Sequence, residues 1–281
     1  MILINIEKLK LKKIYRMFAG LERVKMEFKM IKLEKENLYL VENLFKEIKF
    51  HMAKTALQGY MGEVYVDNLE NPNFSFAMFG KFFYVDGNPN SKFAKQALEQ
   101  VKDFRIIIAN ENWFELIEDV FSSNIEIGTR YSIKKDTKFD KNILRKYIDD
   151  LDEKYTIRKI DIELYNRILN TDSFVTNLKM SDEYEKYGIG FCAFDENDNI
   201  VGLVTSNAIY DNSIEINIKV DENERRKGIA SAITSKLILE CLEKNIYPSW
   251  DAANMCSVNL SKKLGYEYDS EYRIYKVNKD Y

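Results

Sequence analysis

One segment limits the choice of fold more than any other: an alternating strand that runs through a charged loop into a long helix. Residues 213–220 alternate in polarity with the period of two that a strand requires, Ile214, Ile216, Ile218 and Val220 opposing Glu215, Asn217 and Lys219. Charged residues fill most of 221–227, and Gly228 begins the helix expected over 228–244. Such a loop gathers unpaired backbone N–H groups at the positive end of a helix dipole. The segment is therefore compatible with an anion site.

The composition of this loop admits two interpretations. Arg225, Arg226 and Lys227 would attract a phosphate, and Gly228 would let the backbone approach it closely because glycine carries no Cβ. The same residues could instead form an ordinary charged loop before an amphipathic helix. The physical chemistry of the segment alone leaves both open.

The remaining patterns predict an α/β chain (α+β in its order of elements) with two lobes, 1–128 and 129–281. The first lobe is expected to contain helices over 37–57, 91–102 and 113–121 and strands at 63–66, 74–79, 81–85 and 104–109. The second is expected to contain helices over 139–151, 162–169, 228–244 and 255–263 and strands at 129–134, 189–194, 200–209, 213–220, 246–252 and 272–277. The shared order of helix, antiparallel strands, helix, strand and helix hints at a diverged tandem.

Residues 1–25 fit no compact element. One hypothesis is that Met26 or Met30 is the natural start and that the first residues are an upstream extension.

Composition narrows the classes of partner. The formal net charge is −3, which disfavours a phosphate-neutralising surface, so no nucleic-acid partner is expected. The three cysteines lack CxxC spacing, and neither a disulfide framework nor a metal site is predicted. No stretch reaches the roughly 20 apolar residues of a membrane span, and the short apolar start precedes its lysines, the reverse of a signal peptide. We expect a cytoplasmic protein without a membrane partner and leave a homodimer open.

The single histidine, His51, would have to serve any Ser-His-Asp or Cys-His mechanism. Its neighbours predict a helix, and we interpret it as an ordinary surface or packed histidine.

A motif within the charged loop resembles a known family. Arg225-x-x-Gly228-x-Ala230 matches the Arg/Gln-x-x-Gly-x-Gly/Ala signature of GNAT acyltransferases, whose loop holds the pyrophosphate of acetyl-CoA. The surrounding order matches as well, down to a helix that ends in Lys263-Leu264-Gly265-Tyr266, where GNAT domains carry Lys-Leu-Gly-Phe or similar. The resemblance implies a GNAT fold, a mixed central sheet flanked by helices. It also implies a catalytic domain at 129–281 and a degenerate GNAT-like lobe at 1–128.

Further residues resemble one bacterial subfamily, which includes the zwittermicin A resistance acetyltransferase. The second lobe contributes the segments 129–131, 139–140, 188–191, 214–216, 226–230, 239–242 and 248–254. Segments 64–67 and 70–72 of the first lobe fit more loosely, so the resemblance covers roughly residues 37–270.

The resemblance implies acetyl-CoA as cosubstrate, with its pantetheine arm lying where the strands 213–220 and 246–252 splay apart. Main-chain groups from Ile218 to Val220 would then bond to the arm and supply an oxyanion donor. The residues expected to hold the coenzyme are Ile218, Val220, Arg225, Arg226, Lys227, Gly228, Ile229, Ala230, Asn254 and Ser257. Asn254 is also predicted to be the N-cap of the helix over 255–263, and the two roles are compatible.

Three residues are candidates for the chemistry. Glu215 is the candidate general base, directly or through water, although it could equally be a solvated strand glutamate or a structural partner of Arg130 or Lys219. Asp251 on the neighbouring strand is a second candidate. Many GNAT enzymes carry a tyrosine as general acid at the position of Ser261, and its absence here leaves Tyr266, Tyr268 or water to protonate the thiolate.

Aromatic side chains could shape an acceptor site. Trp250 is expected in the core or in the wall of an acceptor pocket. Five phenylalanines are expected in the core or at the roof of a cleft between the lobes: Phe74, Phe76, Phe79, Phe82 and Phe83.

The sequence thus favours an acetyl-CoA-dependent N-acetyltransferase that acts on an amine of a small-molecule acceptor. A resistance or detoxification role follows from the resemblance alone. The alternative is a non-catalytic CoA-binding sensor or scaffold, for which the missing tyrosine at 261 is the best support. Acetylation of protein or peptide amines is a third reading.

Overall fold

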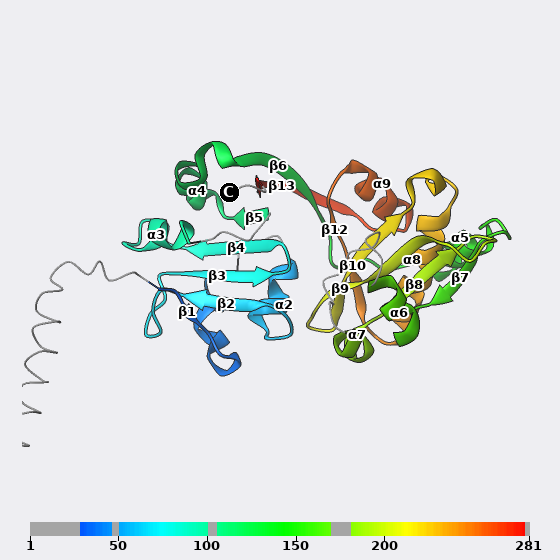
Figure 1. Ribbon diagram of the computed structural model, residues 1–281, viewed down its shortest axis with the longest axis horizontal. Helices are drawn as coiled ribbons and strands as arrows, with labels where there is room; N and C mark the ends of the chain where they lie inside the picture. Colours follow the sequence, from blue (N-terminus) through cyan, green and yellow to red (C-terminus); the bar gives the residue numbers. More distant parts are fainter. Residues whose placement is uncertain (1–28, 47–50, 101–105, 170–180, 279–281) are drawn as a thin grey trace, which may run out of the picture.

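The computed structural model describes residues 29–46, 51–100, 106–169 and 181–278. Two lobes lie side by side in this part of the chain (Figure 1). The proposed extension at residues 1–25 lies outside the described residues.

The first lobe is built on an antiparallel meander. Its strands pair in chain order: β1 (Ile31–Lys32), β2 (Glu63–Val66), β3 (Phe74–Phe79) and β4 (Phe82–Gly87). β5 (Ile106–Ala109) then adds in parallel to β4. Short helices surround these strands: η1 (Lys35–Val41), η2 (His51–Ala53), α2 (Lys54–Leu57), α3 (Ala94–Leu98), η3 (Glu111–Trp113), α4 (Phe114–Phe121) and η4 (Ser122–Asn124).

The second lobe has a sheet of its own in the order β11-β10-β9-β8-β7. Its strands are β7 (Thr156–Lys159), β8 (Gly190–Phe194), β9 (Ile200–Tyr210), β10 (Ser213–Val220) and β11 (Tyr247–Ser249). Its helices are α5 (Lys141–Asp149), α6 (Ile162–Leu169), α7 (Ser181–Tyr187), η5 (Glu222–Glu224), α8 (Ile229–Glu243) and α9 (Met255–Lys263). α8 packs on β8 and β9 and against α5, which gives the sheet flanked by helices that the sequence predicted.

Two strands, β6 (Ile125–Ile133) and β13 (Tyr268–Val277), run between the lobes, and a short third strand, β12 (Asp251–Ala252), joins their sheet. β6 follows the first lobe in sequence, and β13 ends the second. β13 inserts between β5 and β6, and the two residues of β12 pair with the other edge of β6. One sheet therefore runs from β1 to β12. The proposed domain boundary between residues 128 and 129 falls inside β6 and remains a proposal.

The aromatic residues of the β3–β4 hairpin lie in the core, as the first of the two interpretations expected, and one of them, Phe82, also lines a cavity as the second expected. All five phenylalanines from Phe74 to Phe83 are at most 3% exposed. Their side chains divide between two clusters, one on each face of the sheet. The hairpin is therefore rich in aromatic residues because both faces of its sheet are buried.

The helix predicted over 37–57 is wrong in type. The chain forms the 3-10 helix η1, then η2 and the single turn of α2, while residues 47–50 lie outside the described part. Leu38 and Val41 are three residues apart and both buried, which suits the three residues per turn of a 3-10 helix.

The strand predicted over 246–252 is broken. β11 and β12 are separate strands with Trp250 between them, because β11 pairs with β10 and β12 pairs with β6. The sequence also missed β7 and α7. No helix among residues 29–46, 51–100, 106–169 and 181–278 has the length and apolar character needed to cross a bilayer.

Candidate active site

The site begins where two parallel strands part. β10 and β11 pair in parallel at Ser213, Ile214 and Glu215, opposite Tyr247, Pro248 and Ser249. After Ser249 the chain turns to β6, while β10 continues to Val220 with only β9 as a neighbour. Among the described residues, one edge of β10 therefore pairs with no strand beyond Glu215.

The parting opens into a cavity of about 580 Å³. Five consecutive residues of β10, from Glu215 to Lys219, line it. The opposite wall consists of Trp250, Asp251, Ala253, Asn254 and Ser257, and the lobes meet at Arg130 and Asn207. The first lobe closes one side with Met52, Gly80, Lys81 and Phe82.

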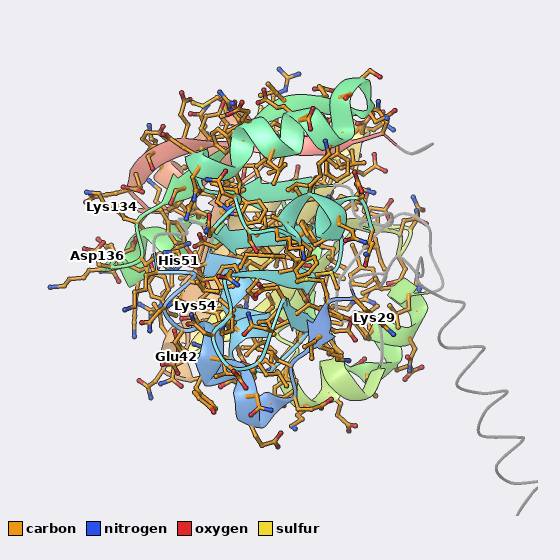
Figure 2. The ribbon with its side chains drawn as sticks, turned by 90° about the vertical axis from the view of Figure 1, so that its left-hand side faces the viewer. Lys29, Glu42, His51, Lys54, Lys134 and Asp136 are labelled. Atoms are coloured by element: carbon orange, nitrogen blue, oxygen red, sulfur yellow. The ribbon has the colours of Figure 1, made fainter. Side chains whose placement is uncertain are left out.

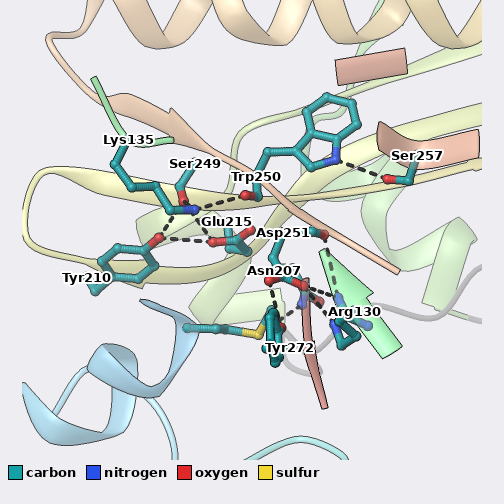
Figure 3. A network of polar contacts seen from close by, with 11 residues as sticks. Arg130, Lys135, Asn207, Tyr210, Glu215, Ser249, Trp250, Asp251, Ser257 and Tyr272 are labelled. Carbon is teal, nitrogen blue, oxygen red and sulfur yellow. Dashed lines mark hydrogen bonds and ion pairs between the residues drawn. The ribbon is translucent and has the colours of Figure 1, made fainter. Parts of the chain in front are cut away.

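A buried carboxylate lies at the point of parting (Figure 3). The Glu215 residue is 1% exposed, and the hydroxyls of Tyr210 and Ser249 each donate to its Oε2 at 2.9 Å. Lys135 Nζ donates to Ser249 Oγ at 2.7 Å and to the carbonyl of Trp250 at 2.9 Å. Burial and the nearby Glu215 carboxylate raise the pKa of Tyr210 well above its usual value, so this phenol stays protonated. Glu215 Oε1 is buried and has no hydrogen-bond partner among the residues that the structure describes.

A second carboxylate is held by an ion pair between β6 and β12. Arg130 Nη2 and Nε lie 2.6 and 2.7 Å from Asp251 Oδ1, and the Tyr272 hydroxyl donates to Oδ2 at 2.7 Å. The Arg130 and Asp251 side chains are 11% and 5% exposed. Burial raises the pKa of Asp251 to about 6, although Arg130 opposes this shift and the Glu215 charge adds to it. Asp251 is thus charged at neutral pH and tied to its partners.

A bulge at the same level brings Asn207 into the cavity. The register between β9 and β10 shifts so that Glu215 pairs with Ala208 and Ile216 with Ser206. Asn207 is the extra residue, and its amide also approaches the Met52 sulfur at 3.7 Å. Bulges of this kind redirect one side chain, here into the cavity wall.

The loop at the far end of β10 has the conformation of an anion site. Gly228 lies at φ +85° as the N-cap of α8, and no side chain caps that helix. A Cβ placed on Gly228 would meet only Leu151, at 3.9 Å, so the space before it is open. Arg225 forms an ion pair with the exposed Glu222, and Lys227 forms one with the less exposed Glu224. The Arg226 side chain is exposed, and its backbone has a φ of +65°. The first N–H groups of α8 are therefore directed at open space beside three cations.

Asn254 caps α9 as predicted. Its side-chain oxygen accepts from Ser257 N at 3.0 Å, and both residues line the cavity. Trp250 Nε1 donates to Ser257 Oγ at 3.0 Å, and Trp250 lies both in the apolar cluster and in the cavity wall. Because an indole can only donate, Ser257 Oγ accepts and keeps its own proton.

The structure does not bring Tyr266 to this cavity. It is 3% exposed, packs against Phe139 and Trp250, and donates its hydroxyl to Pro248 O at 2.5 Å. Ser261 is buried one turn away and donates to Val258 O. Of the predicted coenzyme residues, the cavity wall includes Ile218, Asn254 and Ser257, while Val220 and residues 225–230 follow where β10 leaves it.

Sequence reasoning missed several members of the site. Tyr210, Lys135 and Tyr272 belong to no motif, and Ser249 lies in the segment 248–254 without a role predicted for it. Their roles arise from contacts between side chains on different elements. Asn207 follows two other polar residues, Thr205 and Ser206, so its polarity alone does not single it out.

His51 takes no part in the cavity lining. It lies on the face shown in Figure 2, in η2 near Lys54 and the stretch from Lys134 to Asp136. Burial and the nearby Lys135 and Lys54 lower the pKa of His51 to about 4, so it is neutral at pH 7.

Comparisons with known proteins agree with this geometry. A family model described as GNAT acetyltransferase matches residues 42–275. A relative from Bacillus subtilis strain 168, named uncharacterized N-acetyltransferase YdfB, is 23% identical over 76% of this chain and 85% of its own length.

Solved structures give the same picture. A GCN5-related N-acetyltransferase-like protein from Streptococcus suis 89/1591 is 34% identical with a TM-score of 0.79, covering 86% of this chain and 99% of that one. A tandem GNAT protein from the clavulanic acid biosynthesis pathway, 9% identical with a TM-score of 0.52, covers 88% of this chain and 97% of that one and shows likeness of fold alone. The predicted α/β class and GNAT fold are confirmed. These matches do not confirm the resemblance to the subfamily that includes the zwittermicin A resistance acetyltransferase.

The buried ion pair yields a pH-dependent prediction. Arg130→Met leaves the Asp251 carboxylate without its cation, and at pH 8 we expect a loss of about 3–5 kcal/mol in the free energy of unfolding. Because the Asp251 pKa is already raised to about 6 and loses the opposing effect of Arg130, its carboxyl is protonated at pH 5 and needs no partner. The deficit relative to wild type should therefore shrink as the pH falls from 8 to 5, measured by urea unfolding.

The double variant Arg130→Met/Asp251→Asn is the matched control, because its residue 251 cannot titrate. Its deficit should stay level over the same pH range. A deficit of Arg130→Met that is equal at pH 5 and pH 8 would contradict this account of the pair.

Proposed function

The chain belongs to the GNAT acetyltransferase family, and on that premise we propose that it is an acetyl-CoA-dependent N-acetyltransferase whose acceptor is an amine on a small molecule. The observation that carries this proposal is the position of Glu215. Glu215 lines the cavity where β10 parts from β11, and its buried Oε1 accepts no hydrogen bond from the described residues.

The residues present fit the coenzyme at three points. The open N-terminus of α8, with Arg225, Arg226 and Lys227 beside it, suits a pyrophosphate. The free edge of β10 offers backbone partners to the amides of a pantetheine arm. Between these two points lie Ile218, Asn254 and Ser257 in the cavity wall.

When bound, acetyl-CoA supplies an acetyl group activated as a thioester. Glu215 Oε1 is placed to accept a proton from the amine, while Tyr210 and Ser249 hold Oε2 and so fix the orientation of the carboxylate. Lys135 reaches the same group through Ser249 and balances its charge. Backbone N–H groups on the free edge of β10 would stabilise negative charge that develops on the acyl oxygen.

The proton for the departing thiolate comes from a different place than in family members that carry a tyrosine at position 261. Ser261 and Tyr266 both donate to backbone carbonyls away from the cavity. Ser257 Oγ keeps its proton within the cavity wall, and we assign it, or water next to it, as the donor.

Asp251 serves this site as a positioning residue. Both of its oxygens are engaged by Arg130 and Tyr272, which leaves Glu215 as the carboxylate with a free oxygen. A buried unpartnered carboxylate oxygen is costly in a module that only binds coenzyme, which disfavours the sensor alternative. A resistance or detoxification role rests on the family resemblance alone.

The first test removes the base without changing its shape. Glu215→Gln should lower kcat for an acetylated amine by about a hundredfold or more, because an amide cannot take the proton. The KM for acetyl-CoA should stay within about twofold, since the coenzyme contacts lie further along β10. Glu240→Gln is the matched control, because Glu240 sits on α8 in ion pairs with Lys159 and Lys244 outside the cavity. An unchanged kcat in Glu215→Gln would rule out its role as base.

The second test concerns the coenzyme loop. Gly228→Ala places a Cβ on a backbone at φ +85°, at a cost of about 1–2 kcal/mol, and should raise the KM for acetyl-CoA about tenfold. Gly265→Ala imposes a similar strain at φ +101° with no atom within 4 Å, away from the cavity. The two variants should lose similar stability in thermal unfolding, but only Gly228→Ala should weaken coenzyme binding. Equal KM values in both would argue against a phosphate site at Gly228.

A further inference from the structure

The first lobe contributes a lysine to the cavity wall. Lys81 stands in the turn between β3 and β4 and lines the cavity beside Gly80 and Phe82. Its Nζ lies 5.7 Å from the centre of the Phe82 ring. The Arg130 guanidinium carbon lies 5.4 Å from the centre of the same ring. Two cations therefore flank one aromatic ring where the lobes meet.

The two cations differ in whether a carboxylate balances their charge. Arg130 is paired with Asp251 at 2.6 Å. Among the residues that the structure describes, no carboxylate lies within ion-pair distance of Lys81 Nζ. Within that part of the chain its side chain contacts the Phe82 ring. Partial burial and the nearby Arg130 lower the pKa of Lys81, which means that its charged form lacks a favourable neighbour. An anion placed here would relieve that cost.

The anionic side chains of the cavity are not available to Lys81. Asp251 is engaged by Arg130 and Tyr272, and Glu215 Oε2 by Tyr210 and Ser249. The phosphates of the coenzyme belong to the other end, because the five steps along the strand from Glu215 to Val220 span roughly 16 Å. An anion that pairs with Lys81 would therefore belong to the acceptor.

We propose that the acceptor is an amine that also carries an anionic group, a carboxylate or a phosphate, which pairs with Lys81 while the amine faces Glu215. The inference rests on the proposed N-acetyltransferase function and names its substrate class. It also gives the first lobe a role: the β3–β4 turn selects the acceptor, while the second lobe holds the coenzyme.

Matched pairs of acceptors test the charge requirement directly. One pair is an α-amino acid and its amide, and the other is an aminoalkyl phosphate and the corresponding amino alcohol. We expect wild-type kcat/KM to favour the anionic member of at least one pair by roughly tenfold or more, as for a charge-assisted hydrogen bond. The pair that shows the larger preference tells carboxylate from phosphate.

Three variants assign that preference to the lysine. Lys81→Met should raise the KM for the anionic acceptor about tenfold and leave its uncharged partner unaffected, while Lys81→Arg should keep most of the preference. Lys92→Met is the matched control, because Lys92 Nζ also lies over a neighbouring ring, 5.1 Å from the centre of Phe93, outside the cavity. The KM for acetyl-CoA should be the same in all three variants.

The outcomes separate the two proposals. Turnover of both members of each pair with equal kcat/KM, or an equal effect of Lys81→Met on charged and uncharged acceptors, overturns the inference and leaves amine acetylation in place. A raised KM for acetyl-CoA in Lys81→Met would assign the lysine to the coenzyme and also overturn it. Failure to acetylate any amine would overturn the proposed function and the inference together.

Discussion

The site depends on one constraint, the parting of β10 from β11 after the pairing of Glu215 with Ser249. Two residues further along, the chain is already committed to β6 through β12, so it cannot continue beside β10. On the side of β10 that lines the cavity, a bound ligand can take the place of the strand that has turned away. The fork thus opens the cavity that we propose for the coenzyme, and Glu215 is among the residues that line it. The first lobe shows the contrast, because β4 and β5 stay paired in parallel along the whole of β5 and open no channel.

The strands that cross between the lobes supply the electrostatics of the fork. β6 brings Arg130 and β13 brings Tyr272 to the same carboxylate, Asp251, which β12 holds beside the cavity. A buried carboxylate with a raised pKa is tolerated only because these partners oppose the shift. The two acids therefore differ. Arg130 and Tyr272 contact both oxygens of Asp251, while one oxygen of Glu215 accepts no hydrogen bond from the described residues. The lobes are therefore joined through the site as well as through the sheet.

Local patterns in the sequence predicted local structure well. The bounds of β10 and α9 match the prediction residue for residue, α8 differs by one residue at each end, and Asn254 caps α9. Period-two alternation, an N-cap residue and a glycine at the helix start are properties of consecutive residues, so one sequence suffices to read them. The loop from Arg225 to Ala230 is likewise a local feature. Its predicted role in binding coenzyme stays a prediction.

What the sequence could not predict depends on contacts between distant segments. Arg130 and Asp251 are 121 residues apart, and Ser249 meets Glu215 across 34. The break at Trp250 follows from competition between two sheets for one strand, which hydrophobic periodicity cannot express. The motif predicts a chemical role for Tyr266, but packing directs its hydroxyl to Pro248 O instead.

The position of the coenzyme is the central claim, and amide hydrogen exchange with and without CoA tests it most directly. The account predicts slower exchange at residues 216–220 and 228–230 on addition of CoA. Protection confined instead to residues 108–111 and 127–129, which line a separate cavity between β5 and β13, would contradict it.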